Sequence, residues 1–258
     1  MASSYELFTA VVIFWSKYLS KANEKIKSEK IEINIDGTKN VLDAVSRSDS
    51  VSKFIFASSS EVYGEPLKNP ISEDDTTQGK TLYAVSKLAG EELVKAYNYE
   101  FGNFDYTILR YFNTYGPNMR FDDGRVISNF IVQALRGDKL TLYGDGKQTR
   151  DFIHVSDVAN TLISACSTIP ERSYEIINLG TGKGTSVIDF ASLLLQILKE
   201  ECRPSESKIK HYPPRIGDIR ESLADLTGLN KYADPETFLP FENGIRDLVQ
   251  EELEKAYE

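Results

Sequence analysis

Three side chains in the middle of the sequence have the types and spacing needed for acid–base chemistry on a hydroxyl group. They are Ser59, Tyr83 and Lys87. Tyr83 and Lys87 are four residues apart, about one helical turn, so in a helix they project from the same side. A free tyrosine has a pKa of about 10 and is a poor base, but a lysine ammonium one turn away favours the phenolate. A serine hydroxyl beside them can share the proton of the substrate.

The elements that must position these residues are a buried strand and an amphipathic helix. The run Val51–Ala57 is apolar, β-branched and aromatic, which predicts a buried strand. Its continuation, Ser58-Ser59-Ser60-Glu61-Val62-Tyr63-Gly64, would lie at the carboxyl end of that strand, where ligands bind in open α/β sheets. The spacing of Leu88, Leu93, Val94 and Tyr97 predicts a helix that begins near Tyr83. A surface tyrosine and lysine on an ordinary helix would show the same spacing, so the neighbouring motifs decide.

Further motifs follow in a fixed order. Arg110-Tyr111-Phe112-Asn113-Thr114-Tyr115-Gly116-Pro117 comes after the predicted helix, and Leu142–Gly146, Gln148–Val155 and Arg215–Arg220 come later. With the serine-rich segment and Tyr83–Lys87, these motifs resemble the extended short-chain dehydrogenase/reductase superfamily. Within it they resemble the NAD-dependent nucleotide-sugar epimerases and dehydratases.

The resemblance implies an α/β fold, an N-terminally truncated Rossmann-like doubly wound parallel sheet with a smaller α/β substrate-binding domain. Residues 1–112 plus 151–182 would form the incomplete NAD-binding domain. Residues 113–150 plus 183–258 would form the nucleotide-sugar-binding domain.

The truncation is an expectation from the start of the sequence. Family members hold the cofactor pyrophosphate with a Gly-x-x-Gly-x-x-Gly turn, and here the first glycine is Gly37. Thr9–Phe14 resembles the family's fourth strand, and Asn34-Ile35-Asp36-Gly37-Thr38 resembles the start of the helix that follows it. Lys17–Lys30 would be the helix and loop between them.

The resemblance also implies a set of site residues, with NAD as cofactor and a UDP- or dTDP-sugar as substrate. The expected catalytic residues are Ser59, Glu61, Tyr83 and Lys87. The expected cofactor-binding residues are Asn34, Ser58, Tyr83, Lys87 and Phe112. The expected substrate-binding residues are Ser59, Asn113, Arg125, Val126, Leu140, Tyr143, Arg150, Arg215 and Asp218.

Within the substrate-binding set, the two arginines Arg150 and Arg215 would grip the diphosphate, and Asp218 would bind the ribose hydroxyls. Leu140 and Tyr143 would pack on a pyrimidine and its ribose. An ordinary core position is the alternative for these last two side chains.

In the implied reaction, Tyr83 takes the proton of the sugar C4 hydroxyl while NAD+ takes the hydride. Return of hydride to the other face of the 4-keto sugar gives 4-epimerisation, and a UDP-glucose 4-epimerase is the preferred prediction. Ser60-Glu61 replaces the Asp-Glu pair of the dehydratases, which disfavours dehydration. The segments Ser59–Glu61 and Asp123–Phe130 resemble UDP-glucuronate decarboxylases, whereas Arg215–Arg220 followed by Ser222–Asp225 is more epimerase-like.

A further alternative is a protein of another class. This would be a non-catalytic sugar-nucleotide-binding protein that cannot hold NAD. The missing glycine-rich turn motivates it, and the presence of Ser59, Tyr83 and Lys87 argues against it.

The remaining elements follow from periodicity and turn residues. Val126–Leu135, Val187–Leu198 and Gly244–Tyr257 have helical spacing, and Tyr106–Tyr111, Leu140–Tyr143 and Glu175–Gly180 have the composition of strands. Asp145-Gly146 predicts a hairpin-type turn after Leu140–Tyr143. Gly180–Gly184 has neither the Rossmann nor the P-loop spacing, so we interpret it as a flexible turn.

Composition limits the function further. The chain has 258 residues, 41% hydrophobic and 27% charged, with a net charge of −9, which argues against nucleic-acid binding. Two cysteines, Cys166 and Cys202, make no disulfide framework, and two histidines without a Cys/His cluster predict no metal site. The apolar run Leu7–Trp15 is too short to span a membrane. We therefore expect a cytoplasmic protein, and the resemblance implies a homodimer formed through the Tyr83 helix and its neighbour.

Overall fold

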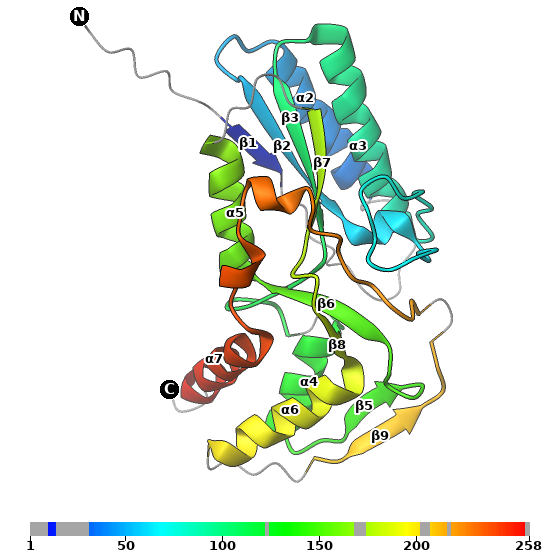
Figure 1. The fold of residues 1–258 in the computed structure, drawn as a ribbon, viewed down its shortest axis with the longest axis vertical. Helices are drawn as coiled ribbons and strands as arrows, with labels where there is room; N and C mark the ends of the chain where they lie inside the picture. Colours follow the sequence, from blue (N-terminus) through cyan, green and yellow to red (C-terminus); the bar gives the residue numbers. More distant parts are fainter. Residues whose placement is uncertain are drawn as a thin grey trace, which may run out of the picture.

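The computed structural model describes residues 10–13, 31–121, 124–167, 174–201, 207–215 and 218–255, with only the backbone for residues 10–13. The predicted helix and loop over Lys17–Lys30, and Cys202, lie outside the described residues. The chain forms two lobes that meet near the middle of the molecule (Figure 1). Within the described ranges, no helix combines the length and the apolar character needed to cross a membrane.

The first lobe is built on a parallel sheet with the strand order β1-β2-β3-β7. The strands are β1 (Ala10–Ile13), β2 (Lys53–Ser59), β3 (Asp105–Tyr111) and β7 (Tyr174–Leu179). Ser59 of β2 is paired with Tyr111 of β3, and Tyr111 is paired with Leu179 of β7. The carboxyl ends of these three strands therefore lie at the same edge of the sheet, which is the edge that faces the second lobe (Figure 1).

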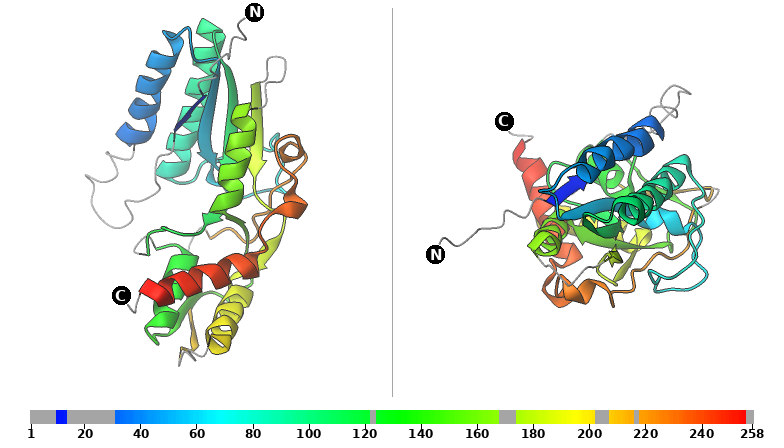
Figure 2. Two further views of the ribbon diagram at one scale, coloured as in Figure 1. Left: turned by 90° about the vertical axis from the view of Figure 1, so that its left-hand side faces the viewer. Right: turned by 90° about the horizontal axis from the view of Figure 1, so that it is seen from above.

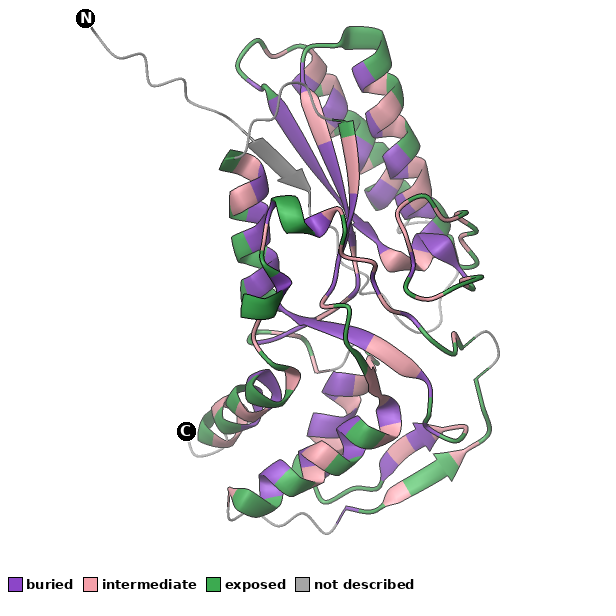
Figure 3. Cartoon of the chain, in the orientation of Figure 1, coloured by how far each residue is buried: buried purple, intermediate pink, exposed green. Residues whose placement is uncertain are grey.

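Helices cover both faces of this sheet (Figure 2). A π-helical turn (Glu32–Asp36), α2 (Gly37–Ser46) and α3 (Leu82–Phe101) lie on one face, and α5 (Val155–Ser167) lies on the other. Alternate residues of β2 serve the two faces, because successive side chains of a strand point to opposite sides. Phe54 and Phe56 pack with the α2 and α3 side chains, whereas Ile55 packs with those of α5. The strand β2 is accordingly buried along its whole length, and β3 is buried in its middle (Figure 3).

The helix α3 is fixed against β2 by a close contact at a glycine. A Cβ atom at Gly90 would lie 2.4 Å from Cζ of Phe56, a distance that real side chains do not tolerate. At its start, Thr81 is the N-cap residue and its hydroxyl accepts a hydrogen bond from the amide of Ala84 at 3.0 Å. At its end, Gly102 adopts a left-handed conformation with φ +61°.

The second lobe holds two small sheets and three helices. β4 (Asn113–Tyr115) and β6 (Thr149–His154) are parallel, and β8 (Gly184–Ser186) is antiparallel to β6. β5 (Leu140–Tyr143) pairs in parallel with β9 (Ile209–Tyr212). The helices are α4 (Val126–Leu135), α6 (Val187–Glu200) and α7 (Phe241–Lys255). Their core contains stacked aromatic pairs, with ring centroids 5.5 Å apart for Phe130–Phe190 and 4.8 Å for Phe152–Phe241.

The prediction of a hairpin at Asp145-Gly146 is wrong. These residues do form a turn, in which the Asp145 carboxylate accepts a hydrogen bond from the amide of Lys147. The strands on either side of the turn are not paired, because β5 uses β9 and β6 uses β4 and β8. The partner of β5 lies about 70 residues later in the chain, so the local turn signal could not reveal it.

A segment near the C-terminal end, Asp218–Leu226, joins the two lobes. On one side, the amides of Thr149 and Asp151 in β6 donate to the carbonyl oxygens of Arg220 and Ser222. On the other side, the amide of Ile71, in the loop after β2, donates to the carbonyl oxygen of Leu223 at 2.8 Å. The edge of the first sheet is thereby tied to the second lobe, and a cavity lies between them.

Candidate active site

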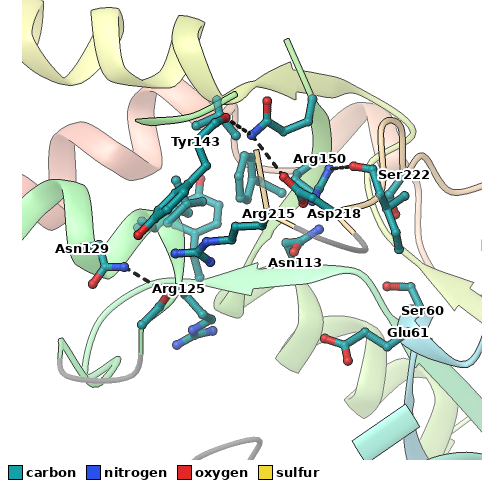
Figure 4. A pocket seen from close by; sticks show the side chains of 18 of the residues that line it. Ser60, Glu61, Asn113, Arg125, Asn129, Tyr143, Arg150, Arg215, Asp218 and Ser222 are labelled. Atoms are coloured by element: carbon teal, nitrogen blue, oxygen red, sulfur yellow. Dashed lines mark hydrogen bonds and ion pairs between the residues drawn. The ribbon is translucent and has the colours of Figure 1, made fainter. Parts of the chain in front are cut away.

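The cavity has a volume of about 440 Å³, within the range of about 300–1,000 Å³ that small-molecule sites occupy. Ser60 and Glu61 lie on one side, and Tyr143 and Asn129 lie on the other (Figure 4). Eight of the residues predicted to form the site line it: Glu61, Asn113, Arg125, Val126, Tyr143, Arg150, Arg215 and Asp218. Four cationic side chains but only two carboxylates are among its described lining residues, which favours an anionic ligand.

Nine further side chains with polar atoms line the cavity and were not predicted as site residues: Ser60, Lys80, Thr81, Thr114, Tyr115, Asn129, Thr141, Gln148 and Ser222. The sequence held a signal for some of them. Gln148 and Ser222 lie within or beside motifs that carry the family resemblance, and Thr81 has the type and position of a helix N-cap. Asn129 lies within Asp123–Phe130, another of the segments that carry the resemblance, whereas Lys80 had no such signal.

The side chain of Arg150 is held in a fixed orientation at the cavity wall. Its Nη2 lies 2.5 Å from Oδ1 of Asp218, and its Nη1 donates to the carbonyl oxygens of Thr149 and Ile219 at 2.8 and 2.7 Å. Gln148 Nε2 lies 3.3 Å from Oδ2 of the same aspartate. The carboxylate of Asp218 is therefore hydrogen-bonded to two cavity side chains, Arg150 and Gln148, and it orients Arg150.

Arg215 comes from the segment that follows β9 and lies over an aromatic ring. Its guanidinium carbon is 4.0 Å from the ring centroid of Tyr143, a cation–π contact. Arg150 and Arg215 thus come from different elements and lie on the same cavity (Figure 4). Two guanidinium groups that converge in this way suit a diphosphate, which both can bind with charge-assisted hydrogen bonds.

The prediction that Leu140 contacts the substrate needs correction. Leu140 is fully buried in the hydrophobic core of the second lobe and is not among the residues that line the cavity. Because side chains alternate along a strand, its neighbour Thr141 and the predicted residue Tyr143 face the cavity instead.

Tyr83 and Ser59 lie together beside the cavity. Tyr83 interacts electrostatically with Glu61 and Arg125, which both line the cavity, and its hydroxyl is hydrogen-bonded to Ser59. Burial and the negative charge of Glu61 raise the pKa of Tyr83 to about 12, although Ser59 and Arg125 act in the opposite direction. Burial thus outweighs the hydrogen bond to Ser59 and the charge of Arg125, and the role of Lys87 in favouring the phenolate stays a prediction.

Lys87 lies deep against β2. Its Nζ donates to the carbonyl oxygen of Ala57 at 2.9 Å and is 5.9 Å from the ring centroid of Tyr83. Burial lowers the pKa of Lys87 to about 8. An ammonium group has three N–H donors, and among the described residues only Ala57 accepts a hydrogen bond from this one.

The remaining residues predicted to bind the cofactor have partners within the protein. Asn34 Nδ2 donates to Oγ of Ser86 at 2.8 Å, and the Ser58 hydroxyl donates to Glu91. Phe112 is buried in a small core cluster with Val62 and Ile71. The side chains of Asn34 and Ser58 thus form hydrogen bonds to residues of α3. Among the described residues, the ammonium of Lys87 has one hydrogen-bond acceptor, Ala57.

These residues fit one end of NAD. The unused donors of Lys87, beside Tyr83, match the hydroxyl groups of the nicotinamide ribose. For the pyrophosphate, the chain contains no Gly-x-x-Gly-x-x-Gly turn before β2.

The buried ammonium of Lys87 predicts a specific pH dependence of stability. Because its folded pKa of about 8 lies below the ordinary value of 10.5, only the unfolded chain binds this proton between those pH values. Stability should therefore rise with pH in this window. Relative to Lys87→Met, the free energy of unfolding of the wild type should increase by about 3 kcal/mol from pH 8 to pH 10.5. Urea unfolding of both proteins measures the difference, and a difference that stays constant with pH would contradict the assignment.

Comparison with known proteins identifies relatives of this chain. Residues 6–180 match the model of the NAD dependent epimerase/dehydratase family. The chain is 38% identical over 237 residues to the UDP-N-acetyl-alpha-D-glucosaminuronate decarboxylase of Bacillus cytotoxicus, covering 86% of this chain and 70% of that protein. It is 38% identical over 197 residues to the putative UDP-glucose 4-epimerase of Methanocaldococcus jannaschii, covering 76% and 61%.

The fold has matching solved structures. The UDP-glucose 4-epimerase of Thermotoga maritima with UDP-glucose superimposes with a TM-score of 0.82 at 28% identity, covering 96% of this chain and 78% of that one. The chain spans between about half and 70% of the length of the curated relatives that it matches, which include the UDP-glucuronic acid decarboxylase 1 of Danio rerio at 51%. The family model covers more than half of the chain, and the family predicted from the motifs is confirmed. The chain belongs to the NAD-dependent epimerase/dehydratase family.

Proposed function

We propose that this chain binds a UDP-sugar in the cavity and acts as a 4-epimerase through transient oxidation of the sugar at C4. The observation that carries this proposal is the place of Tyr83. Tyr83 lies one helical turn before Lys87 and is hydrogen-bonded to Ser59. Its pKa responds to the charges of Glu61 and Arg125, which line a cation-rich cavity. A dTDP-sugar would present the same diphosphate, and the substrate named here rests on the names of the relatives.

In the proposed reaction, Arg150 and Arg215 hold the diphosphate, and the sugar extends toward Glu61 and Tyr83. Ser59 donates a hydrogen bond to the C4 oxygen, and Tyr83 accepts the C4 hydroxyl proton. When bound, NAD+ accepts the hydride from C4 and returns it. For Tyr83 to act as a base its pKa must fall from about 12, and the charge of Arg125 and the hydrogen bond to Ser59 act in that direction. Epimerisation is the simplest outcome because it needs no group beyond those of this shared step.

A second candidate, decarboxylation of a UDP-uronate, is favoured by the position of Arg125. Its Nη1 donates to the carbonyl oxygen of Thr114 at 2.9 Å, and its charge acts on Tyr83. A guanidinium at this place could bind a carboxylate at C6 of the sugar. After oxidation at C4 that carboxylate is β to a ketone. The C5–C6 bond then breaks, CO2 leaves, the electron pair passes to the C4 oxygen as an enolate, and C5 is protonated to give a 4-keto pentose. Return of the hydride to C4 and of the proton from Tyr83 to its oxygen would complete the UDP-pentose.

Product analysis tests the function. The purified chain is incubated with NAD+ and either UDP-glucose or UDP-glucuronate, and products are identified by proton NMR. Conversion of UDP-glucose to UDP-galactose supports the epimerase, whereas formation of UDP-xylose from UDP-glucuronate supports the decarboxylase. Tyr83→Phe should lower either rate by about 100-fold or more, since it removes the general base. Tyr97→Phe, on the same helix but away from the cavity, is the control and should keep the wild-type rate.

Binding of the UDP-sugar without any conversion would contradict both enzymatic proposals. It would support instead the non-catalytic sugar-nucleotide-binding protein. Equal rates for Tyr83→Phe and the wild type would refute the assigned role of Tyr83.

We also propose that the chain forms a homodimer across α3. Val85, Ala96 and Tyr99 are exposed at positions spaced along one side of this helix, and the Tyr99 side chain is 91% exposed. Apolar residues aligned in this way on a helix are typical of a helix-packing interface. Light scattering at micromolar concentration should give twice the monomer mass, and Tyr99→Glu should shift the protein toward the monomer. A monomeric wild type would refute the proposal.

A further inference from the structure

A row of buried polar side chains crosses the first sheet, one residue before its strands end. Ser58 of β2 is paired in register with Arg110 of β3, and Arg110 is paired with Asn178 of β7. Because they share one register position in a parallel sheet, their side chains point to the same face. None of the three is more than 3% exposed. Polar residues in the middle of an apolar sheet need partners, and the structure supplies them from several segments.

The first partner is Glu91 of α3, which is fully buried. Its two carboxylate oxygens accept hydrogen bonds from Nε and Nη2 of Arg110 at 3.0 and 2.7 Å, a bidentate pair. The Ser58 hydroxyl donates to the same carboxylate. Glu91 lies one turn after Lys87 and two turns after Tyr83, so all three project from one side of the helix.

The second set of partners comes from the segments after β2. The guanidinium of Arg110 lies 4.7 Å from the ring centroid of Tyr63, and its Nη1 donates to the carbonyl oxygen of Glu73 at 3.1 Å. The Tyr63 hydroxyl donates to Oδ1 of Asn178 at 2.7 Å, and the backbone amide of Asn178 donates to Oε1 of Glu73 at 2.9 Å. Tyr63 closes the short 3₁₀ helix Ser60–Tyr63, which carries Glu61 into the cavity.

Each member of this network is close in sequence to a residue of the proposed active site. Ser58 precedes Ser59, Arg110 lies three residues before Asn113, and Tyr63 lies two residues after Glu61. A buried ion pair is a poor source of stability, because desolvation of both charges offsets their attraction. Asn178 is held further by Nδ2, which donates to the carbonyl oxygen of Ile71 at 2.8 Å. A network of buried groups that have exchanged water for such partners fixes one geometry.

We propose that Glu91 is a positioning residue that, through Arg110 and Ser58, sets the distance of Tyr83 and Lys87 from Ser59. The inference rests on the proposed function for its consequence in catalysis. Its structural content, that Glu91 controls the contact between Tyr83 and Ser59, is independent of turnover. Arg150 and Arg215 belong to other elements, so the network should not affect binding of the diphosphate.

Ser58→Ala and Glu91→Gln test the proposal by separating chemistry from binding. Each should lower kcat by about 10- to 100-fold, because small displacements of reacting groups are costly, while the Kd of UDP measured by calorimetry changes less than about twofold. Tyr97→Phe is the matched control, since it also removes one hydrogen bond of α3, to Asp43 at 2.5 Å. The proposal is overturned if Ser58→Ala keeps the wild-type kcat, or if Kd rises as much as kcat falls. Ser58→Ala removes only a hydroxyl, so it remains informative if Glu91→Gln does not fold.

A spectroscopic measurement tests the network without turnover. With tyrosine labelled at Cζ with carbon-13, the resonance of Tyr83 is assigned as the one lost in Tyr83→Phe. Ser58→Ala and Glu91→Gln should shift this resonance because they change the hydrogen bond to Ser59, and Tyr97→Phe should not. A shift without any turnover in the wild type would refute the proposed function but support the positioning role. An unchanged resonance in both variants would refute the positioning role.

Discussion

The close contact between α3 and β2 is the constraint on which the rest of the site depends. Gly90 lets the helix approach until Phe56 fills the space that a Cβ would need, and Lys87 reaches the carbonyl oxygen of Ala57. Tyr83 is then held beside Ser59, which ends the same strand. A helix displaced by one side-chain layer would separate the proposed base from its hydrogen-bond partner, although both residues would still be present.

Burial opposes the charged forms of both Tyr83 and Lys87 in this site. Burial raises the pKa of Tyr83 to about 12 and lowers that of Lys87 to about 8, so each group is less prone to carry its charge than in water. Four cationic side chains in the described part of the chain line the cavity beside them. One of these, Arg150, is paired with the carboxylate of Asp218. Reaction at Tyr83 therefore depends on positive charge near its hydroxyl, and Arg125 and Lys87 are the groups placed to provide it.

Local sequence patterns predicted many of the helices and strands. They did not predict pairings between segments that are far apart in the sequence. The helix Val126–Leu135 and the strand Leu140–Tyr143 have the predicted bounds, because periodicity reports burial directly. The family was also predicted correctly, and most of the expected substrate-binding residues line the cavity. The hairpin after Leu140–Tyr143 was wrong because β9 is a remote partner, and Leu140 was misplaced because one step along a strand reverses the side chain. The bond of Ser58 to Glu91 had no sequence signal, since a serine hydroxyl bonds equally well to cofactor or protein.

The central claim is that the cavity between the lobes binds the diphosphate of a UDP-sugar through Arg150 and Arg215. Calorimetric titration of the chain with UDP-glucose, for the wild type and Arg215→Ala, tests it most directly. The account predicts saturable binding that Arg215→Ala weakens by about 10- to 100-fold, the loss expected for charge-assisted hydrogen bonds. No binding to the wild type, or equal binding to both proteins, would contradict it.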